Sequence, residues 1–210
     1  MSYAVKEAFL TLQGEGMQAG RRAVFLRFAG CNLWSGREED RAAAVCNFCD
    51  TDFVGTDGLG GGKFADAVDL AAHAASLWGT GAEQRLVVIT GGEPMLQLDL
   101  ALVDALHDEG FRIAVESNGT IAAVAGIDWL CISPKAGSVV VQRVGDELKL
   151  VWPQSGIDPA ELESWDFAHW LVQPMDCADG AGARQAAIAL AMERPRWRLS
   201  LQAHKIVGLR

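Results

Sequence analysis

Short apolar runs alternate with longer amphipathic segments along most of the chain. The short runs, such as residues 85–90 (RLVVIT) and 112–116 (RIAVE), are rich in β-branched residues, which is typical of buried strands. The longer segments, residues 64–78 and 97–109, carry apolar residues at helical spacing, and a glycine that can end a helix follows each of them. This alternation predicts an α/β fold in which helices connect the strands of a parallel sheet.

Further strands and one helix are expected on either side of this central region. An alanine-rich segment, residues 179–192, has the composition of a helix. Near the start, residues 5–12 and 23–27 are expected to form two strands that pair as a hairpin across residues 14–16 (GEG). The later strands are expected at residues 129–132, 147–151, 169–172 and 197–201.

Each expected strand ends in polar residues that make poor core material. Parallel strands around a barrel bring their carboxyl ends to one mouth, where barrel enzymes carry their chemistry. For any single strand, an ordinary polar transition into a loop is the alternative. The repeated pattern predicts an incomplete (β/α)6-type partial TIM barrel with an N-terminal hairpin, formed by residues 1–210 as a single domain. The polar strand ends include Arg27, Thr90, Glu116, Ser133, Lys149, Gln173 and Gln202.

Three cysteines follow the first barrel strand. Cys46 and Cys49 form a C-x2-C pair, and fourteen residues separate Cys31 from this pair. Three thiolates on one loop can hold a four-iron cluster and leave its fourth iron open to a ligand. The alternatives are a structural zinc site completed by another cysteine or histidine, and three unrelated buried cysteines. Residues 32–45, which are rich in charges of both signs, are expected to be a surface insertion in this cluster loop.

Two neighbouring features favour chemistry at the cysteine loop. Phe48, directly before the last cysteine, offers an aromatic face on which a purine can stack. Gly91, Gly92, Glu93 and Pro94 follow the strand at residues 85–90. The glycines allow a ligand to touch the backbone, while their carbonyls or Glu93 can accept hydrogen bonds from an ammonium group. A zinc module needs neither feature.

Composition and charge exclude several classes of protein. The 210 residues are 50% hydrophobic and 21% charged, which is typical of a globular domain. The formal net charge of -9 argues against nucleic acid as a partner. We expect no membrane span and a cytoplasmic location, because no apolar run is long enough and the start lacks the features of a signal peptide. In that reducing compartment the five cysteines are expected to bind metal, catalyse or pack.

The cysteine loop, its aromatic residue and the GGEP segment together resemble the radical S-adenosylmethionine superfamily. In that superfamily three cysteines bind a 4Fe-4S cluster, whose free iron chelates the methionine part of S-adenosyl-L-methionine. The reduced cluster then cleaves the sulfonium to a 5'-deoxyadenosyl radical. The usual cysteine spacing there is C-x3-C-x2-C, whereas this chain has C-x14-C-x2-C.

Motifs along the whole chain are similar to one family of that superfamily, the 7-carboxy-7-deazaguanine synthases of queuosine and deazapurine biosynthesis, which include members with extended spacing. The resemblance implies a carbon–nitrogen lyase that converts 6-carboxy-5,6,7,8-tetrahydropterin to 7-carboxy-7-deazaguanine with loss of ammonia. The adenosyl radical takes hydrogen from C6 of the substrate, the ring contracts, and hydrogen returns to regenerate the cofactor. The motifs are residues 9–16 (FLTLQGEG), 27–34 (RFAGCNLW), 49–51 (CDT), 132–135 (ISPK), 173–175 (QPM) and 201–205 (LQAHK).

The resemblance also implies roles for individual residues. Cys31, Cys46 and Cys49 bind the 4Fe-4S cluster, and Thr51 binds Mg2+. The adenosyl cofactor is held by Phe48, Cys49, Asp50, Gly92, Ser133, Pro134, Lys135, Gln173, Pro174, Met175 and Asp176. The pterin substrate is held by Leu12, Gln13, Gly14, Arg27, Thr90 and Arg210.

The chemistry of several residues agrees with these roles independently of the family. Arg27 can meet a carboxylate with a two-pronged fork, and Gln13 and Thr90 offer the neutral donors and acceptors that a pterin edge requires. Mg2+ prefers hard oxygen ligands, so Asp50 and Asp52 compete with Thr51. Two further residues, Glu116 and His204, can carry protons or serve as hydrogen-bonded structural groups.

Partners and alternative functions complete the expectations. The family implies a homodimer and an electron donor such as flavodoxin. One alternative is a radical enzyme that activates a partner protein by taking hydrogen from a glycine, which would leave the pterin-sized polar set without a use. The other is the zinc-binding structural module.

Overall fold

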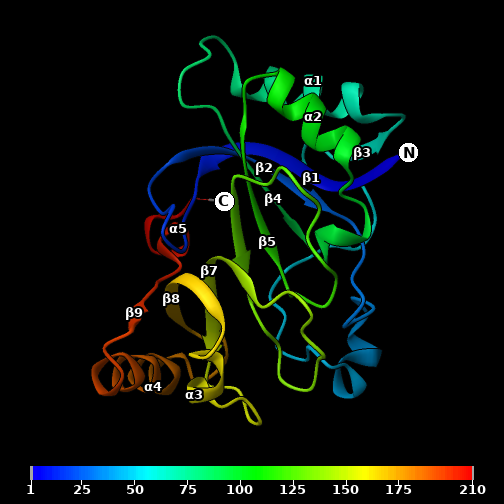
Figure 1. Ribbon diagram of the computed structural model, residues 1–210. Coiled ribbons are helices and arrows are strands. Elements are labelled where there is room, and N and C mark those ends of the chain that lie inside the picture. The colour runs from blue at the N-terminus through cyan, green and yellow to red at the C-terminus, as the bar shows by residue number, and fades with distance from the viewer. Residues whose placement is uncertain (1, 210) are drawn as a thin grey trace.

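A single mixed sheet organises the molecule. The computed structural model describes residues 2–209, and their nine strands form one open sheet with β3 and β9 at its edges (Figure 1). Strand β1 is antiparallel to both of its neighbours, whereas β2 and the strands from β4 to β9 run parallel. In sheet order the strands are β3 (Gly62–Phe64), β1 (Tyr3–Leu12), β2 (Arg22–Phe28), β4 (Leu86–Gly91), β5 (Arg112–Ser117), β6 (Trp129–Ile132), β7 (Val144–Trp152), β8 (Asp166–Pro174) and β9 (Trp197–Leu199).

The expected α/β class and N-terminal hairpin are confirmed. β1 and β2 pair from Leu12 opposite Arg22 to Val5 opposite Phe28. Strand β3 was not expected from the sequence, because it is only three residues long and lies in a glycine-rich segment. It adds to the free edge of β1 and lengthens the sheet beyond the parallel strands.

The helices begin at capping residues, which explains why two of them start later than their periodicity suggests. Asp66 caps α1 by accepting from the backbone N–H of Asp69, and Asp99 caps α2 by accepting from that of Leu102. Phe64 therefore belongs to β3 and not to the helix. The helices are η1 (Glu38–Ala43), α1 (Ala67–Trp78), η2 (Pro94–Leu96), α2 (Leu100–Asp108), α3 (Pro159–Leu162), α4 (Gly180–Glu193) and α5 (Ala203–Val207).

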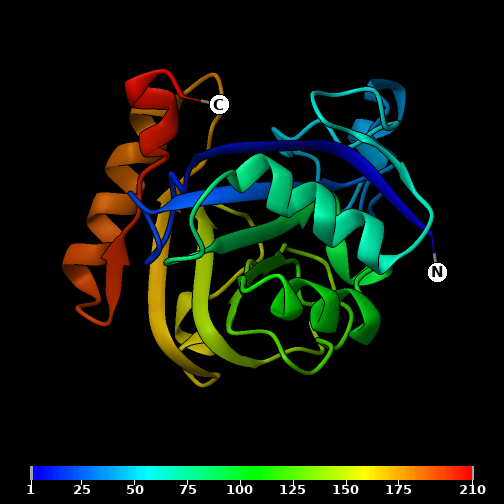
Figure 2. The same cartoon turned by 90° about the horizontal axis from the view of Figure 1, so that it is seen from above.

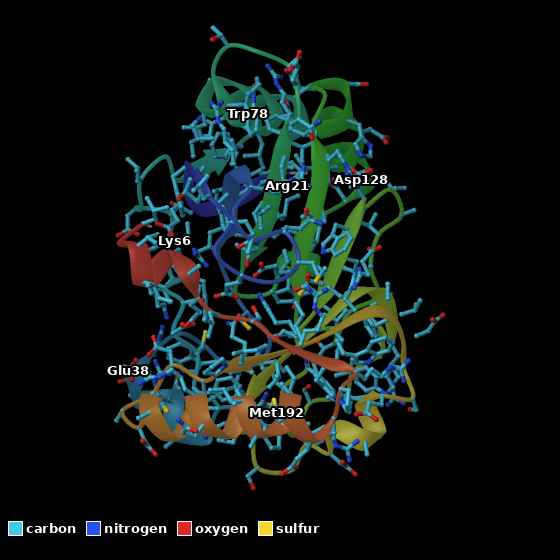
Figure 3. The ribbon with its side chains drawn as sticks, turned by 90° about the vertical axis from the view of Figure 1, so that its left-hand side faces the viewer. Lys6, Arg21, Glu38, Trp78, Asp128 and Met192 are labelled. Atoms are coloured by element: carbon cyan, nitrogen blue, oxygen red, sulfur yellow. The ribbon has the colours of Figure 1, made fainter. Side chains whose placement is uncertain are left out.

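Not every strand-to-strand connection contains a helix. Residues 118–128, between β5 and β6, and residues 133–143, between β6 and β7, are all described and run without one. Helices α1 and α2 pack together beside β1, β2 and β5, whereas α4 packs on β8 and β9 (Figure 2). Trp78 at the end of α1 and Met192 on α4 mark these two groups at opposite ends of the molecule (Figure 3). Within residues 2–209, no helix has the length and apolar character of a membrane span.

The period of two along each strand separates the core from the interior of the curved sheet. On β2, Val24, Leu26 and Phe28 join the main hydrophobic core under the helices. Ala23 on the same strand faces the opposite way, into a small second cluster with Val88 of β4. Further along this inner face the apolar residues give way to polar ones. On the inner face of the sheet, each strand therefore carries apolar residues in its first part and polar residues toward its carboxyl end.

Replacement of a core residue on β2 tests this division. Leu26→Ala is expected to lower the free energy of unfolding by about 2–5 kcal/mol, because Leu26 is fully buried under the helices. Val68→Ala, on the exposed side of α1, is the control and should change it by less than about 0.5 kcal/mol. Chemical denaturation measures both values, and equal effects would contradict the assignment of the core.

Candidate active site

A cavity of about 360 Å³ opens at the carboxyl ends of the parallel strands. Side chains from the ends of β2, β4, β5, β7 and β8 line it, together with the cysteine loop and residues near the C-terminal helix α5. This is the position that the polar strand ends predict. The lining includes most residues singled out from the sequence, namely Leu12, Gln13, Gly14, Arg27, Cys31, Cys46, Phe48, Cys49, Asp50, Thr51, Thr90, Gly92, Ser133, Lys135, Gln173 and Asp176.

Three of the expected residues that the structure describes are not part of this lining. Pro134, Pro174 and Met175 adjoin lining residues in the chain but do not themselves line the cavity. Met175 contributes a backbone N–H that donates to the carbonyl of Trp152 at 2.8 Å. Arg210 lies outside the described residues. The roles of these four residues therefore stay predictions.

The three loop cysteines share one cavity, and two of them interact directly. A hydrogen bond from Cys46 lowers the pKa of Cys49 to about 6, so the Cys49 sulfur favours the thiolate form near neutral pH. The same bond, together with burial, raises the pKa of Cys46, and burial raises that of Cys31. Among the residues that the structure describes, no three His, Cys, Asp or Glu side chains converge on a single metal position, which is the arrangement that a zinc site needs. A set of three thiols along one wall fits a cluster whose irons each take one thiolate.

The insertion at residues 32–45 folds back onto the cysteine loop through Arg41. The Arg41 guanidinium donates to the carbonyl of Asn47 at 3.1 Å and to that of Cys49 at 3.0 Å. It also lies 4.0 Å above the ring of Trp34, which packs edge-on against Phe53. No local pattern distinguishes Arg41 from the other charged residues of the insertion. In the folded chain it fixes the backbone on both sides of Phe48.

The GGEP segment is shaped by packing against the start of the cysteine loop. A Cβ on Gly92 would lie 2.1 Å from the carbonyl oxygen of Gly30, and one on Gly91, at φ 136°, would lie 2.2 Å from that of Phe28. Both positions therefore require glycine. The backbone of β4 consequently lies directly against the loop that carries Cys31.

Of the two kinds of acceptor expected for a ligand's ammonium group, the glycine carbonyls and Glu93, Glu93 has a structural role instead. Its side chain is fully buried, and its carboxylate accepts from the hydroxyl of Ser117 at 2.8 Å and from the backbone N–H groups of Asn118 and Met95 at 2.8 and 2.9 Å. Burial raises the pKa of Glu93. The carboxylate thus ties the end of β4 to the end of β5 and leaves the ligand role to the backbone.

Lys135 and Phe48 face each other across the cysteine end of the cavity. The Lys135 Nζ lies 6.0 Å from the centroid of the Phe48 ring and donates to the hydroxyl and carbonyl oxygens of Ser133 at 2.7 and 2.9 Å. Burial lowers the pKa of Lys135. An aromatic ring and a half-buried amine therefore flank the space beside the three thiols.

Arg27, Thr90 and Gln13 lie on the sheet side of the cavity. Arg27 and Thr90 are direct neighbours in the β2–β4 register. The Arg27 Nε donates to the Glu7 carboxylate of β1 at 2.8 Å, and Gln13 donates to Glu116 at 2.9 Å. The fold brings these residues together as expected, and it adds two carboxylates, Glu7 and Glu116, to the same wall.

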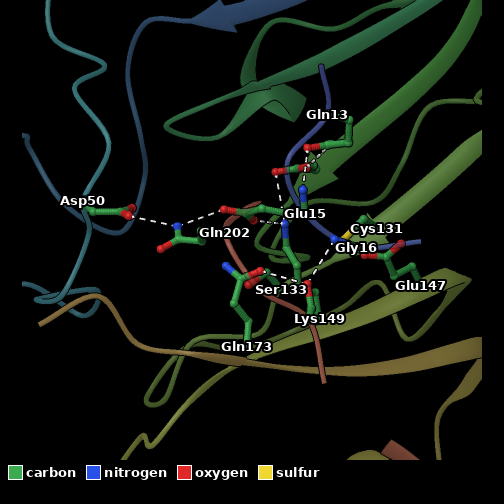
Figure 4. A network of polar contacts seen from close by, with 12 residues as sticks. Gln13, Glu15, Gly16, Asp50, Cys131, Ser133, Glu147, Lys149, Gln173 and Gln202 are labelled. Atoms are coloured by element: carbon green, nitrogen blue, oxygen red, sulfur yellow. Dashed lines mark hydrogen bonds and ion pairs between the residues drawn. The ribbon is translucent and has the colours of Figure 1, made fainter. Parts of the chain in front are cut away.

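A network of charged and polar side chains surrounds the buried Lys149 at the cavity (Figure 4). Lys149 of β7 donates to Glu15 at 2.6 Å and lies 3.3 Å from Glu116 of β5. Gln202, just before α5, donates to Glu15 at 2.9 Å and to Asp50 at 3.2 Å. Glu15 was considered only as a turn residue from the sequence. The network therefore joins the β1–β2 turn, β5, β7, the C-terminal segment and the cysteine loop.

The two aspartates that flank Thr51 are each paired with a lysine. Asp50 contacts Lys205 of α5 at 2.7 Å, and Asp52 contacts Lys6 of β1 at 2.9 Å. Lys205 also contacts Asp176 at 2.6 Å. These contacts hold α5 over the rim of the cavity, where Ala203 donates its N–H to the carbonyl of Gly14 at 2.8 Å.

Fold and cavity together define an α/β enzyme with a thiol-lined site at the carboxyl ends of parallel strands. No family model matches the chain. Curated proteins from Caulobacter vibrioides, Bradyrhizobium diazoefficiens and Bordetella pertussis are 61%, 59% and 57% identical to it, with the whole of each chain covered, and each is named 7-carboxy-7-deazaguanine synthase. The chain belongs to the 7-carboxy-7-deazaguanine synthase family.

A solved structure supports the same relationship. The crystal structure of QueE from Escherichia coli matches with a TM-score of 0.69 at 26% sequence identity, covering 97% of this chain and 95% of that one. The agreement over nearly the full length means that the two chains share their fold.

Serine substitutions test the thiol assignment. Cys31→Ser, Cys46→Ser and Cys49→Ser should each abolish binding of the iron–sulfur cluster, because a hydroxyl is a poor ligand for it. Cys131→Ser is the control, since Cys131 is buried beside Glu147 on β6 and its sulfur lies 3.5 Å from that carboxylate. Iron and acid-labile sulfide content and the visible absorption spectrum provide the measurement. Loss of the cluster in Cys131→Ser would contradict the assignment.

Arg41 offers a second test of the cysteine loop. Arg41→Met removes both donations to the loop carbonyls, each worth about 1.5–3 kcal/mol for a charged donor, so a reconstituted cluster should lose iron to a chelator several-fold faster. Arg37→Met is the matched control, because the Arg37 side chain is 73% exposed in the same insertion. Equal rates of iron loss in the two variants would show that Arg41 does not brace the loop.

Proposed function

We propose that the chain converts 6-carboxy-5,6,7,8-tetrahydropterin to 7-carboxy-7-deazaguanine with loss of ammonia, as a step of queuosine biosynthesis. The observation that carries this proposal is the full-length identity of 57–61% with curated 7-carboxy-7-deazaguanine synthases. The single cavity that contains both the three thiols and the polar pterin-sized set agrees with it. In this proposal the enzyme is a radical S-adenosylmethionine lyase.

Cys31, Cys46 and Cys49 would hold a 4Fe-4S cluster, and the adenosyl cofactor would occupy the space between Phe48 and Lys135. When both are bound and the cluster is reduced, the cluster and the adenosyl cofactor would supply the radical that abstracts hydrogen. The protein's part is to orient the cofactor: Phe48 offers a stacking face, and the backbone of Gly92 lines the cavity beside Cys31, where its peptide groups can meet the ligand. Ser133, Gln173 and Asp176 add polar groups along the same wall.

The substrate would bind at the sheet side of the cavity. Arg27 is suited to bind the carboxylate of the substrate. A guanidinium carries five N–H donors, and the donor at Arg27 Nε is the one that contacts Glu7. Thr90, Gln13 and the backbone of Leu12 and Gly14 would contact the ring. Arg210 is assigned to the substrate by family resemblance alone.

Magnesium would be held by Thr51 together with oxygen atoms of the substrate and water. Lysines already neutralise the neighbouring carboxylates of Asp50 and Asp52, which leaves the Thr51 oxygen as the protein ligand of this segment. Mg2+ commonly binds through few protein ligands and completes its shell with water and substrate oxygens. The arrangement therefore suits a metal that arrives with its substrate.

The wider setting of the enzyme follows from the family. We propose that β2 and β4–β9 act as a partial barrel with residues 1–210 as one domain, and that the enzyme is a cytoplasmic homodimer. An electron donor such as flavodoxin would reduce the cluster from the side of the cysteine loop. The open sheet, with β3 and β9 at separate edges, supports an incomplete barrel.

Turnover tests the proposal directly. Anaerobically reconstituted and reduced protein, given S-adenosyl-L-methionine, Mg2+ and 6-carboxy-5,6,7,8-tetrahydropterin, should form 7-carboxy-7-deazaguanine with little net loss of the sulfonium. Chromatography with mass spectrometry follows both compounds. Cleavage of the sulfonium without any deazaguanine would overturn the proposed substrate and favour the activation of a partner protein. Failure to assemble any cluster would favour the zinc module.

A further inference from the structure

Lys149 is the most deeply buried charged group at the substrate side of the cavity. Its side chain is 5% exposed, and its ammonium lies 2.6 Å from the Glu15 carboxylate and 3.3 Å from that of Glu116. A buried ion pair costs several kcal/mol of desolvation for each charge, so it contributes little net stability compared with an apolar residue. The charge is therefore a candidate for a functional role.

The two carboxylates that contact Lys149 come from different elements and both line the cavity. Glu15 belongs to the β1–β2 turn, and Glu116 lies near the end of β5. Each of them also engages a neutral amide of the wall: Gln202 donates to Glu15, and Gln13 donates to Glu116. Lys149 contacts both carboxylates directly, and Gln13 links the same two residues by donating to Glu116 and accepting from the backbone N–H of Glu15.

A second residue of β7 braces the same turn without touching Glu15. Glu147, two residues before Lys149 and on the same face of the strand, accepts from the backbone N–H of Met17 at 3.0 Å. Gly16 packs so closely on this carboxylate that a Cβ there would lie 2.2 Å from Glu147 Oε1. β7 therefore contacts the turn twice, once through the backbone and once through the charge of Glu15.

We infer that Lys149 is a positioning residue for the substrate site, because its buried ammonium holds the carboxylates of Glu15 and Glu116 as a pair of anionic acceptors at the cavity wall. Such a pair favours a ligand edge that carries several N–H donors, as a reduced pterin does. The inference rests on the proposed function and adds to it the residue that sets the charge and geometry of the wall.

The charges around this pair determine how it responds to pH. Burial raises the pKa of Glu15, but the charge and hydrogen bond of Lys149 outweigh it and bring the pKa to about 2, with Gln202 and Gln173 contributing. Asp50 also faces Glu15 and opposes its ionisation. The other titratable groups around Lys149 are Glu116, Glu147, Cys131 and Lys135. Without the ammonium, both contributions of Lys149 are lost, so the pKa of Glu15 rises.

Lys149→Met tests the inference in the reconstituted holoenzyme. In the variant, the Glu15 carboxylate would become protonated at low pH, and the substrate site would lose one hydrogen-bond acceptor. KM for the pterin should therefore increase about tenfold or more near pH 6 and recover partly as the pH rises. The acidic limb of kcat/KM should move to higher pH than in the wild type. Fluorescence titration with the pterin, without reductant or S-adenosyl-L-methionine, should show the same pH-dependent weakening of binding.

Glu147→Gln is the matched control for a purely structural effect. It removes a buried charge on the same strand, β7, at a residue that contacts the same turn. The contact between Lys149 and Glu15 is left intact. The acidic limb of its kcat/KM profile should lie at the same pH as in the wild type. In Lys149→Ala, added propylammonium should restore binding, whereas propanol, which has similar size and no charge, should not.

Clear outcomes would overturn the inference. An unchanged KM and pH profile in Lys149→Met, or the same loss in Glu147→Gln with no shift of the limb, would reduce Lys149 to a packing role. If Lys149→Met does not fold, Lys149→Gln keeps a polar group and is expected to show the same shift. If the wild-type protein forms no deazaguanine, the proposed function itself is overturned. If the wild type forms the product and the Lys149 variants keep its KM and pH profile, only the role of Lys149 is overturned.

Discussion

The ion pair between Lys149 and Glu15 is the interaction on which the arrangement of the site depends. It joins β7, in the parallel part of the sheet, to the turn of the antiparallel hairpin. Through Gln202 the same carboxylate reaches Asp50 in the cysteine loop, and through Glu116 the same ammonium reaches β5. Because buried charges must be compensated, these segments can adopt only positions that keep the contacts intact. The substrate wall and the cluster loop are thereby held in fixed relation.

The curved sheet explains why chemistry gathers at one end. Alternate residues of each strand face either the helices or the interior, and along the interior they change from apolar to polar toward the carboxyl ends. Val88 and Thr90 of β4 illustrate the change, since Val88 packs in the inner apolar cluster and Thr90 lines the cavity two residues later. A parallel sheet repeats this change in every strand, so the polar ends form a single wall.

Close packing of the connecting loops then completes the site. Gly91 and Gly92 allow β4 to lie against the loop that carries Cys31. The Glu93 carboxylate accepts hydrogen bonds from Ser117 and Asn118 at the end of β5. The insertion contributes Arg41, whose guanidinium holds the C-x2-C backbone from the outer side. The residues expected to bind the cluster, cofactor and substrate are therefore held in place by residues with a structural role.

The sequence by itself determined the α/β class, the hairpin, the three-cysteine loop and most of the cavity lining. These follow from local periodicity and from motifs whose residues are close together in the chain, so no distant contact is needed to recognise them. Arg27, Thr90 and Gln13 could be assigned to the pterin from the family resemblance, and their chemistry agrees with that role.

Only the tertiary structure decided how the charges are paired. Glu15 and Lys149 are separated by 134 positions, and Gln202 lies further still from Asp50, so no local pattern links them. The structural role of Glu93 has the same origin, because two of its partners, Ser117 and Asn118, lie at the end of the next strand of the sheet. Burial and pairing are properties of the packed chain, and they determine which carboxylates face a ligand and which hold the protein together.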